Sequence, residues 1–338
     1  MTPSSVGLRL AAGVLVVGAI AAQQGSPPEQ PSFAAFLAEV RAEARARGIG
    51  EAVVDAALAG VEAPAPAVVE RDRAQPEQIR SLDDYVEGRV TSRSERTARD
   101  MQRRYLQTLT RVSRRYGVPV PVLVSVWGLE SNFGRYTGSH PTVAALATLA
   151  YDGRRQLFRE ELFHALTILD QKHVGLDEMR GSWAGAMGQP QFMPSSYLKH
   201  AVDFDGDGRA DIWTSQPDVF ASIANYLVSA GWTTGERWGR EVRATASVLD
   251  RIGRDVPLRQ RGCQALRQMT VARPLAEWRR LGVRLAGGQP LPRADMSASL
   301  VRGTRRHFLV YRNYLSILDY NCANSYAISV GLLADRIW

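Results

Sequence analysis

The sequence predicts a mainly helical protein of the α+β class, in which a small β-rich lobe accompanies a larger helical part. Several long segments place apolar residues at the three- and four-residue spacing of one helical face. Between about Arg240 and Arg305 the pattern changes to short Val and Leu runs broken by Gly and Pro, which is typical of strands and turns. With 338 residues, the chain is long enough for a large domain with a sub-lobe or for two small domains.

Residues 1–22 are interpreted as a secretory signal peptide and are excluded from the fold. An apolar run from Val6 to Ala22 carries one charge, Arg9, and its core from Leu10 onward is too short to span a bilayer. An A-x-A cleavage pattern occupies residues 19–21. The weakly charged start leaves an uncleaved anchor as the alternative. No later segment is apolar enough to cross a membrane, so we expect a soluble, exported protein with no stable membrane insertion after cleavage.

The net charge of the chain is +8, and about +7 after removal of Arg9 with the signal peptide. A basic exported protein suits an anionic polymer such as the cell wall, although many basic proteins have no such partner. We expect no nucleic-acid partner.

The chain has two cysteines, Cys263 and Cys322. Export makes a disulfide chemically feasible, but the spacing alone leaves two free buried thiols as an equal alternative. Two cysteines without histidine partners do not make a zinc site.

The N-terminal helical segment is assigned to residues 31–80. Phe33 to Leu58 predicts two amphipathic helices broken at residues 48–50, because the apolar residues from Phe33 to Val40 share one face. Ala63 to Gln78 contains three prolines and is interpreted as a connecting loop.

The central part, residues 81–235, is predicted to consist mostly of helices. The expected helices are a long basic one at Ser92–Tyr116, a buried one at Pro119–Asn132, and two more at Arg155–His173 and Asp218–Ala230. The β-rich lobe follows at residues 240–303. Residues 304–338 then return to helix, with the last helix at Ala323–Ile337.

Glu130 is the candidate catalytic acid. It is the only charged residue between Arg115 and Arg135, in a segment that is apolar nearly all round and begins with two prolines. Gly134 suits the C-terminal cap of this helix. Glu130 would then lie at the negative end of a buried helix, where desolvation and the helix dipole both favour the protonated form that a general acid needs. The alternative is a structural glutamate that caps the helix or pairs with a buried arginine.

A second candidate segment, Ser182 to Tyr197, combines two glycines with aromatic and amide side chains. Small residues allow the backbone to approach a ligand closely. Aromatic faces beside polar amides are suited to sugars, which have apolar faces and polar edges. The alternative is a loop that packs against the core.

Residues 203–211 fit the start of a calcium-binding loop of the EF-hand type. Asp203, Asp205 and Asp207 supply carboxylates, and Arg209 offers its carbonyl. The twelfth position is Thr214 rather than Glu, so the standard loop is incomplete. The alternative is an acidic turn held by hydrogen bonds from aspartate side chains to the backbone.

Three strings of the sequence, in this order and spacing, resemble the membrane-bound lytic murein transglycosylase B family. They are WGLESNFG at 127–134, AGAMGQPQFMPSSY at 184–197 and DFDGDG at 203–208, and Tyr320-Asn321 with Tyr326-Ala327 match further on. The resemblance runs from about Phe33 to the end of the chain. It implies a lysozyme-like helical catalytic core with an appended β lobe. It also implies cleavage of peptidoglycan between N-acetylmuramic acid and N-acetylglucosamine without water, giving 1,6-anhydromuramic ends.

The resemblance also implies the roles of individual residues. Glu130 matches the single catalytic carboxylate of the family, and Arg154 with Arg155 matches an arginine pair near the peptide stem. Asp218 matches a carboxylate that closes a longer metal loop, and we expect calcium or sodium there as a structural ion. The positions that match substrate-binding residues are Tyr85, Ser182, Gln191, Phe192, Tyr226, Tyr320, Asn321 and Tyr326. The chain has no lipobox cysteine, which argues against a lipid anchor.

The mechanism implied needs one protein carboxylate and no cofactor, because the substrate supplies the second group. Ordinary glycosidases use two carboxylates, and only Glu130 lies in a buried setting. The alternatives are a hydrolytic muramidase on the same scaffold and a non-catalytic protein that binds peptidoglycan. The histidines show no metal-ligand spacing, and no G-x-S-x-G pattern is present. We expect a periplasmic enzyme whose partners are glycan strands and other cell-wall enzymes.

Overall fold

The computed structural model describes residues 31–73, 81–152 and 155–338, and for Arg73 and Arg155 the backbone alone. Residues Phe33–Trp338 cluster into one unit. The predicted signal peptide and Arg154 lie outside the described residues. Within the described ranges, no helix is both long and apolar enough to cross a membrane.

The N-terminal segment is helical, as the sequence predicts. α1 and α2 are separated at residues 47–50, where Gly48 adopts a left-handed φ of 83°. The expectation of a loop over Ala63–Gln78 is wrong for its middle part, where a helix forms. Pro66 occupies its first position, where the missing N–H of proline is not needed, and Val68 is fully buried. The bounds are α1 (Phe33–Ala46), α2 (Glu51–Leu58) and α3 (Pro66–Arg73).

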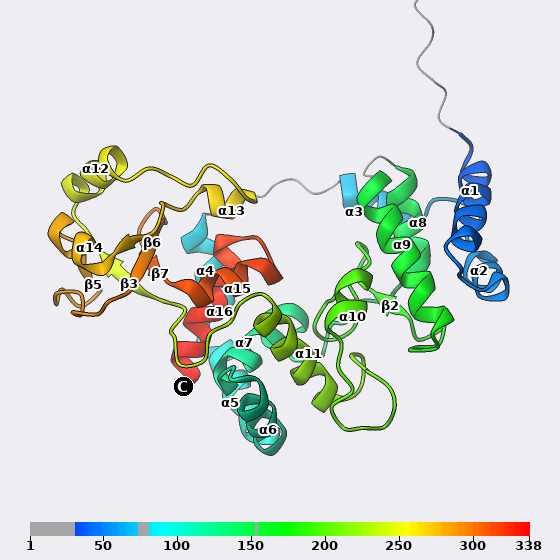
Figure 1. The fold of residues 1–338 in the computed structure, drawn as a ribbon, viewed down its shortest axis with the longest axis horizontal. Coiled ribbons are helices and arrows are strands. Elements are labelled where there is room, and N and C mark those ends of the chain that lie inside the picture. The colour runs from blue at the N-terminus through cyan, green and yellow to red at the C-terminus, as the bar shows by residue number, and fades with distance from the viewer. Residues whose placement is uncertain (1–30, 74–80, 153–154) are drawn as a thin grey trace, which may run out of the picture. The chain divides into compact units, whose positions relative to one another are not determined.

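The central part is a set of helices with one short two-stranded ladder (Figure 1). The basic helix expected over Ser92–Tyr116 is two helices, because Tyr105 leaves helical geometry at φ −109° and ψ 19°. The ring of Tyr105 packs edge-on against Trp127 and Phe220 there. The elements are α4 (Leu82–Arg89), α5 (Ser92–Arg104), α6 (Leu106–Tyr116), α7 (Val120–Ser131), β1 (His140–Pro141), α8 (Thr142–Tyr151), α9 (Arg155–Asp170), β2 (Arg180–Gly181), α10 (Pro194–His200) and α11 (Gln216–Ser229).

The β-rich lobe contains a five-stranded antiparallel sheet in the order β4-β6-β7-β3-β5. The sequence pattern there indicated strands and turns, but three helices also lie within residues 240–303. The elements are β3 (Gly239–Arg243), α12 (Ala246–Asp255), α13 (Gln264–Arg267), β4 (Arg273–Pro274), α14 (Leu275–Leu281), β5 (Arg284–Leu285), β6 (Ser297–Arg302) and β7 (His307–Val310).

The central strands β6 and β7 are buried on both faces, which explains their near-continuous apolar runs. Leu300 and Leu309 are paired in register and pack with the lobe's own helices. The next pair, Val301 and Phe308, belongs to the core around α7. The sheet therefore joins the lobe to the helical part through one face.

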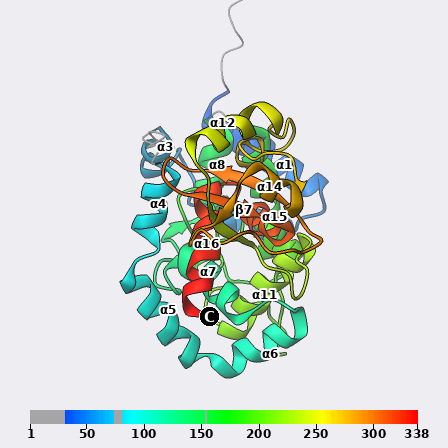
Figure 2. The same ribbon diagram turned by 90° about the vertical axis from the view of Figure 1, so that its left-hand side faces the viewer.

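The chain ends in α15 (Arg312–Tyr320) and α16 (Asn324–Ile337), which return to the helical core. α16 packs along α7, and both views of the ribbon place the two helices side by side (Figure 2). One apolar core surrounds α7, α11 and α16, and another surrounds α1, α8 and α9. Tyr320 packs against both cores.

Candidate active site

Glu130 lies in the last turn of α7, whose residues are otherwise nearly all buried. The helix ends at Ser131, and its C-terminal cap is Asn132 in the left-handed conformation (φ 49°, ψ 52°) rather than Gly134 as expected. Phe133 is also left-handed, and its ring folds back over Gly128, where an added Cβ would lie 2.6 Å from it. This tight turn holds the end of the helix, while the side chain of Glu130 stays partly accessible.

Burial raises the pKa of Glu130 from 4.5 to about 7. The last turn of a helix adds to this effect, because its free carbonyls disfavour a negative charge. The Tyr326 hydroxyl and the positive charge of Arg89 act in the opposite direction and lower the pKa. Near neutral pH, Glu130 is therefore balanced between its acid and base forms, as an acid/base catalyst requires.

Two tyrosines of the C-terminal helices lie near Glu130, and Tyr226 of α11 packs against one of them. Burial, followed by the charge of Glu130, raises the pKa of Tyr320 and of Tyr326. The Tyr320 hydroxyl donates to the Pro190 carbonyl oxygen at 2.7 Å, and the Tyr226 ring lies 4.6 Å from the Tyr320 ring, centroid to centroid. The Tyr326 hydroxyl faces Glu130 but makes no hydrogen bond of standard geometry in the described part of the chain.

The glycine-rich segment lies beside these tyrosines. Phe192 is 2% exposed and packs beneath Tyr226 and Tyr320, at ring distances of 5.6 and 5.8 Å. It therefore supports the tyrosine rings and displays no free face. Gln191 has a left-handed φ of 54°, and its amide donates to the carbonyls of Thr137 (3.1 Å) and Gly188 (2.8 Å).

The next two predicted site residues are Ser182, at the start of the glycine-rich segment, and Asn321. The Ser182 hydroxyl oxygen accepts from the backbone N–H groups of Ala184 and Ala186, so it shapes the turn that follows. Asn321 is exposed and directly follows Tyr320. Arg154 and the side chain of Arg155 lie outside the described residues.

Sequence reasoning missed Arg89. It lies four residues after Tyr85 on α4, and its guanidinium is 5.6 Å from the centroid of the Tyr85 ring. Tyr85 in turn acts on the pKa of Tyr326. The i,i+4 spacing of Tyr85 and Arg89 was the available signal, but it carries information only once α4 is recognised as a helix.

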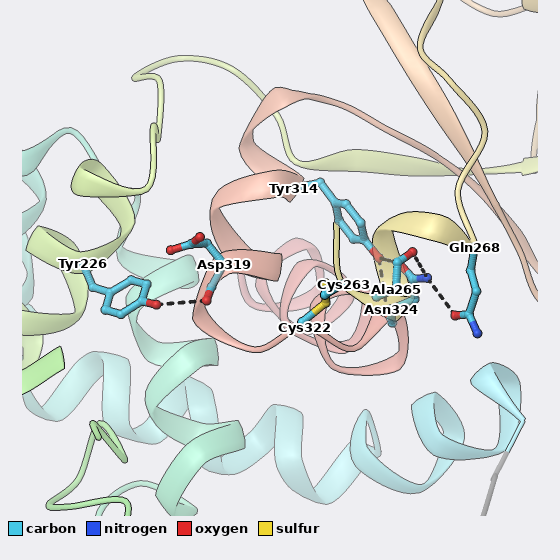
Figure 3. Close-up of a disulfide and its surroundings, with 8 residues drawn as sticks. All are labelled: Tyr226, Cys263, Ala265, Gln268, Tyr314, Asp319, Cys322 and Asn324. Atoms are coloured by element: carbon cyan, nitrogen blue, oxygen red, sulfur yellow. Dashed lines mark hydrogen bonds between the residues drawn. A yellow bond between two sulfur atoms is a disulfide. The ribbon is translucent and has the colours of Figure 1, made fainter. Parts of the chain in front are cut away.

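A disulfide fixes the turn between α15 and α16. Cys263 and Cys322 are bonded, with their Cα atoms 6.5 Å apart (Figure 3). Beside it, Asn324 accepts from the Tyr314 hydroxyl at 2.8 Å and donates to the Ala265 carbonyl at 2.9 Å. The bond joins the region of α13 to the segment between Tyr320 and Tyr326. Of the two alternatives that the sequence left open, free thiols and a disulfide, the structure has the disulfide.

Part of the predicted metal loop converges. Carboxylate oxygens of Asp203, Asp205 and Asp218 lie within 4.8 Å of one another, and Asp218 is fully buried. Burial, together with the nearby Asp205 carboxylate, raises the pKa of Asp218. Asp207 is not in this group, and its carboxylate accepts from the Arg209 N–H at 2.8 Å. Three oxygen ligands in one cluster fit a hard cation such as calcium.

The fold and site define a lysozyme-like class: a mainly helical core with a small sheet, and a carboxyl of raised pKa among tyrosines. The chain belongs to the transglycosylase SLT domain family, which matches residues 32–335.

Known relatives agree with this membership. Membrane-bound lytic murein transglycosylase B of Escherichia coli (strain K12) is 40% identical over 135 residues, which is 39% of this chain and 37% of that protein. SltB3 from Pseudomonas aeruginosa, in complex with NAG-anhNAM-pentapeptide, is 41% identical with a TM-score of 0.81, over 90% of this chain and 79% of that one. Soluble lytic transglycosylase SltB1 from the same organism is 29% identical with a TM-score of 0.75, over 91% of this chain and 98% of that one.

Proposed function

We propose that the protein is a lytic transglycosylase that cleaves the β-1,4 bond between N-acetylmuramic acid and N-acetylglucosamine in peptidoglycan. The observation that carries the proposal is Glu130, a carboxyl with a pKa of about 7 at the end of α7. The relative SltB3 binds NAG-anhNAM-pentapeptide, whose anhydro sugar is the product that this reaction leaves.

Glu130 acts first as an acid and then as a base. It donates its proton to the glycosidic oxygen, which leaves as the 4-hydroxyl of N-acetylglucosamine. The N-acetyl carbonyl of the muramic residue stabilises the cationic C1 from the opposite face. The Glu130 carboxylate then takes the proton of the muramic C6 hydroxyl as its oxygen bonds to C1. The net change is the transfer of one proton from the muramic C6 hydroxyl to the leaving oxygen, so no water enters and the acid form of Glu130 is regenerated.

The surroundings of Glu130 support a single-carboxylate scheme. The described groups that shift its pKa are Arg89 and Tyr326, and no described carboxylate is among them. A second catalytic carboxylate within about 5.5 Å, as in retaining glycosidases, would raise the pKa by charge repulsion. An internal hydroxyl gains a large effective concentration over water, on the order of several kcal/mol of barrier in favourable cases.

Digestion of purified sacculi in oxygen-18 water tests the chemistry. Intramolecular closure leaves the new muramic end unlabelled and one water lighter than a hydrolysed end, as mass spectrometry of the muropeptides measures. A labelled reducing end as the main product would make the protein a hydrolytic muramidase. Glu130→Gln, correctly folded, should have no turnover. Strand binding without turnover by the unmodified chain would mark a non-catalytic binding protein.

We also propose that Asp203, Asp205 and Asp218 hold a structural calcium ion, with the Asp207 side chain and the Arg209 carbonyl as further ligands. A relative from Escherichia coli, the lytic transglycosylase Slt35, has been solved in complex with calcium. The cluster includes no group of the proposed chemistry, so the ion would stabilise the fold alone. Thermal melting with calcium and with a chelator tests this, because a ligand that binds only the folded state must raise the midpoint. An unchanged midpoint would refute it.

The proposed place of action is the periplasm, with peptidoglycan strands as the main partner. The disulfide is in keeping with an oxidising compartment. Cell fractionation, with detection of the mature N-terminus by mass spectrometry, tests both export and removal of residues 1–22.

A further inference from the structure

A cavity of about 560 Å³ lies at the opposite end of α7 from Glu130. It is lined by Pro119 and Val122 at the start of α7, by the segment that joins α11 to β3, and by the end of α16. At about 1.5 Å per residue, Val122 lies about 12 Å from Glu130 along the helix axis. The cavity is therefore a separate place from the acid, and its volume is within the range of small-ligand sites.

Three of the seven tryptophans of the chain line this cavity. Trp338 is 80% exposed, so its ring is free to contact a ligand. Trp238 packs against Gly331, and its indole N–H donates to the Asp335 carboxylate at 3.2 Å. Trp232 is buried in the wall, and its indole N–H makes no hydrogen bond within the described part of the chain. A buried donor without an acceptor costs free energy, which a ligand that supplies the acceptor would recover.

The charged side chains of the lining decide which kind of ligand fits. They are Glu236, Arg237 and Asp335, and their charges sum to one negative charge, although the whole chain carries +8. An anionic ligand is therefore disfavoured here. The closest nitrogen of Arg237 lies 3.7 Å from an oxygen of Asp335, and the two side chains are 62% and 34% exposed. This pair can still donate hydrogen bonds to a neutral ligand and accept them from it.

We propose that this cavity binds N-acetylhexosamine units of a β-1,4 glycan strand, as a second glycan site away from Glu130. A sugar ring has an apolar face, which suits the Trp338 ring, and hydroxyl groups at its edge, which suit Arg237 and Asp335. Its acetamido carbonyl is an acceptor for the unpaired N–H of Trp232. That the strand is peptidoglycan rests on the proposed function. Two attachments on one chain hold a polymer more firmly than one.

Nitrogen-15 NMR of the tryptophan indoles tests the second site apart from catalysis. The full chain carries Glu130→Gln, and the probe is the β-1,4 tetrasaccharide of N-acetylglucosamine, which is neutral and has no peptide. The indole signals of Trp232 and Trp338 should shift in a saturable way as the probe is added. The signal of Trp278, which is buried in the β-rich lobe, should not respond.

Trp338→Ala and Asp335→Asn should each weaken the binding that the Trp232 signal measures by about fivefold, through the loss of an aromatic contact or of a charged acceptor. The controls are Leu258→Ala and Asp250→Asn, which remove an exposed apolar side chain and an exposed carboxylate outside the cavity. Both controls should bind the probe as the parent chain does, and equal melting midpoints establish that each variant is folded. In sedimentation with purified sacculi, the two cavity variants should leave more protein in the supernatant than the controls.

Unmoved Trp232 and Trp338 signals up to the highest soluble concentration of the probe would overturn the second site, as would cavity variants that sediment like the controls. A shift of these signals by tetramethylammonium but not by the tetrasaccharide would overturn it in favour of a cationic ligand. None of these results depends on turnover. A chain that forms 1,6-anhydromuramic ends but keeps the Trp232 signal unmoved would retain the proposed function without this site. A chain that binds the probe at Trp232 but cleaves nothing would retain the site and lose the proposed function.

Discussion

Replacing Glu130 with glutamine should stabilise the folded protein above neutral pH and leave its stability almost unchanged in acid. Folding raises the pKa of this carboxyl from 4.5 to about 7. Between these two values the folded chain holds a proton that the unfolded chain has released, so stability falls as the pH rises. Above the folded pKa, the loss is complete. Glutamine has the same shape and does not titrate, so it escapes the loss.

The pKa difference sets the size of the effect. At about 1.36 kcal/mol per unit, the rise corresponds to roughly 3 kcal/mol. Glu130 keeps some contact with solvent, and screening lowers the expected gain to about 2 kcal/mol. Urea unfolding should therefore show a difference near zero at about pH 4.5 and close to the full gain at about pH 8.5, with an unchanged m-value.

Glu39→Gln is the matched control, since it makes the same chemical change at an exposed position of α1. Its free energy of unfolding should differ little from that of the unmodified chain at both pH values. If Glu130→Gln gives the same difference at pH 4.5 and pH 8.5, the carboxyl is not desolvated in the folded state. The assignment of Glu130 as the acid would then lose its physical basis.

Three further outcomes follow from the contacts around the acid. Arg89→Gln removes a positive charge that lowers the pKa of Glu130. The basic limb of the pH profile of kcat/KM should move to higher pH, and an unmoved limb would show that the two charges do not interact. Replacing Cys263 and Cys322 with serine opens a loop with a sequence separation of 59 residues, which should cost about 4 kcal/mol of stability; an unfolding curve unchanged by the substitution would contradict this. Asn321→Ala, at an exposed position beside Tyr320, should slow cleavage of sacculi far more than it lowers the melting midpoint, whereas equal losses would make Asn321 structural.

The buried setting of Glu130 could be predicted from sequence because its signal is local. One charged residue in an apolar helix that begins with prolines indicates both the helix and the burial, and α7 agrees to within a residue at each end. The cap was harder to predict. Asn132 and Phe133 both adopt left-handed conformations, and the Phe133 ring packs against Gly128. The preferences of single residues do not predict this ring contact.

The partners of the acid could not be found in the same way. Arg89, Tyr320 and Tyr326 reach Glu130 from three separate helices, and their approach depends on how α16 packs along α7. The tyrosines were expected through the family resemblance alone. Arg89 was not expected at all, because α4 is short and weakly patterned. The disulfide was left open for a related reason, since its two cysteines are separated by 59 residues in the sequence and only the fold shows that they meet.

In the proposed reaction, the Glu130 carboxyl first donates a proton and then accepts one. This requires that neither its protonated form nor its ionised form be strongly favoured. Burial at the end of α7 alone would push the pKa of Glu130 higher and make it a poor base. Arg89 and Tyr326 act in the opposite direction and keep the pKa near 7. Arg89 therefore helps to keep both forms of Glu130 accessible near neutral pH, which is why its substitution should change the pH profile of catalysis.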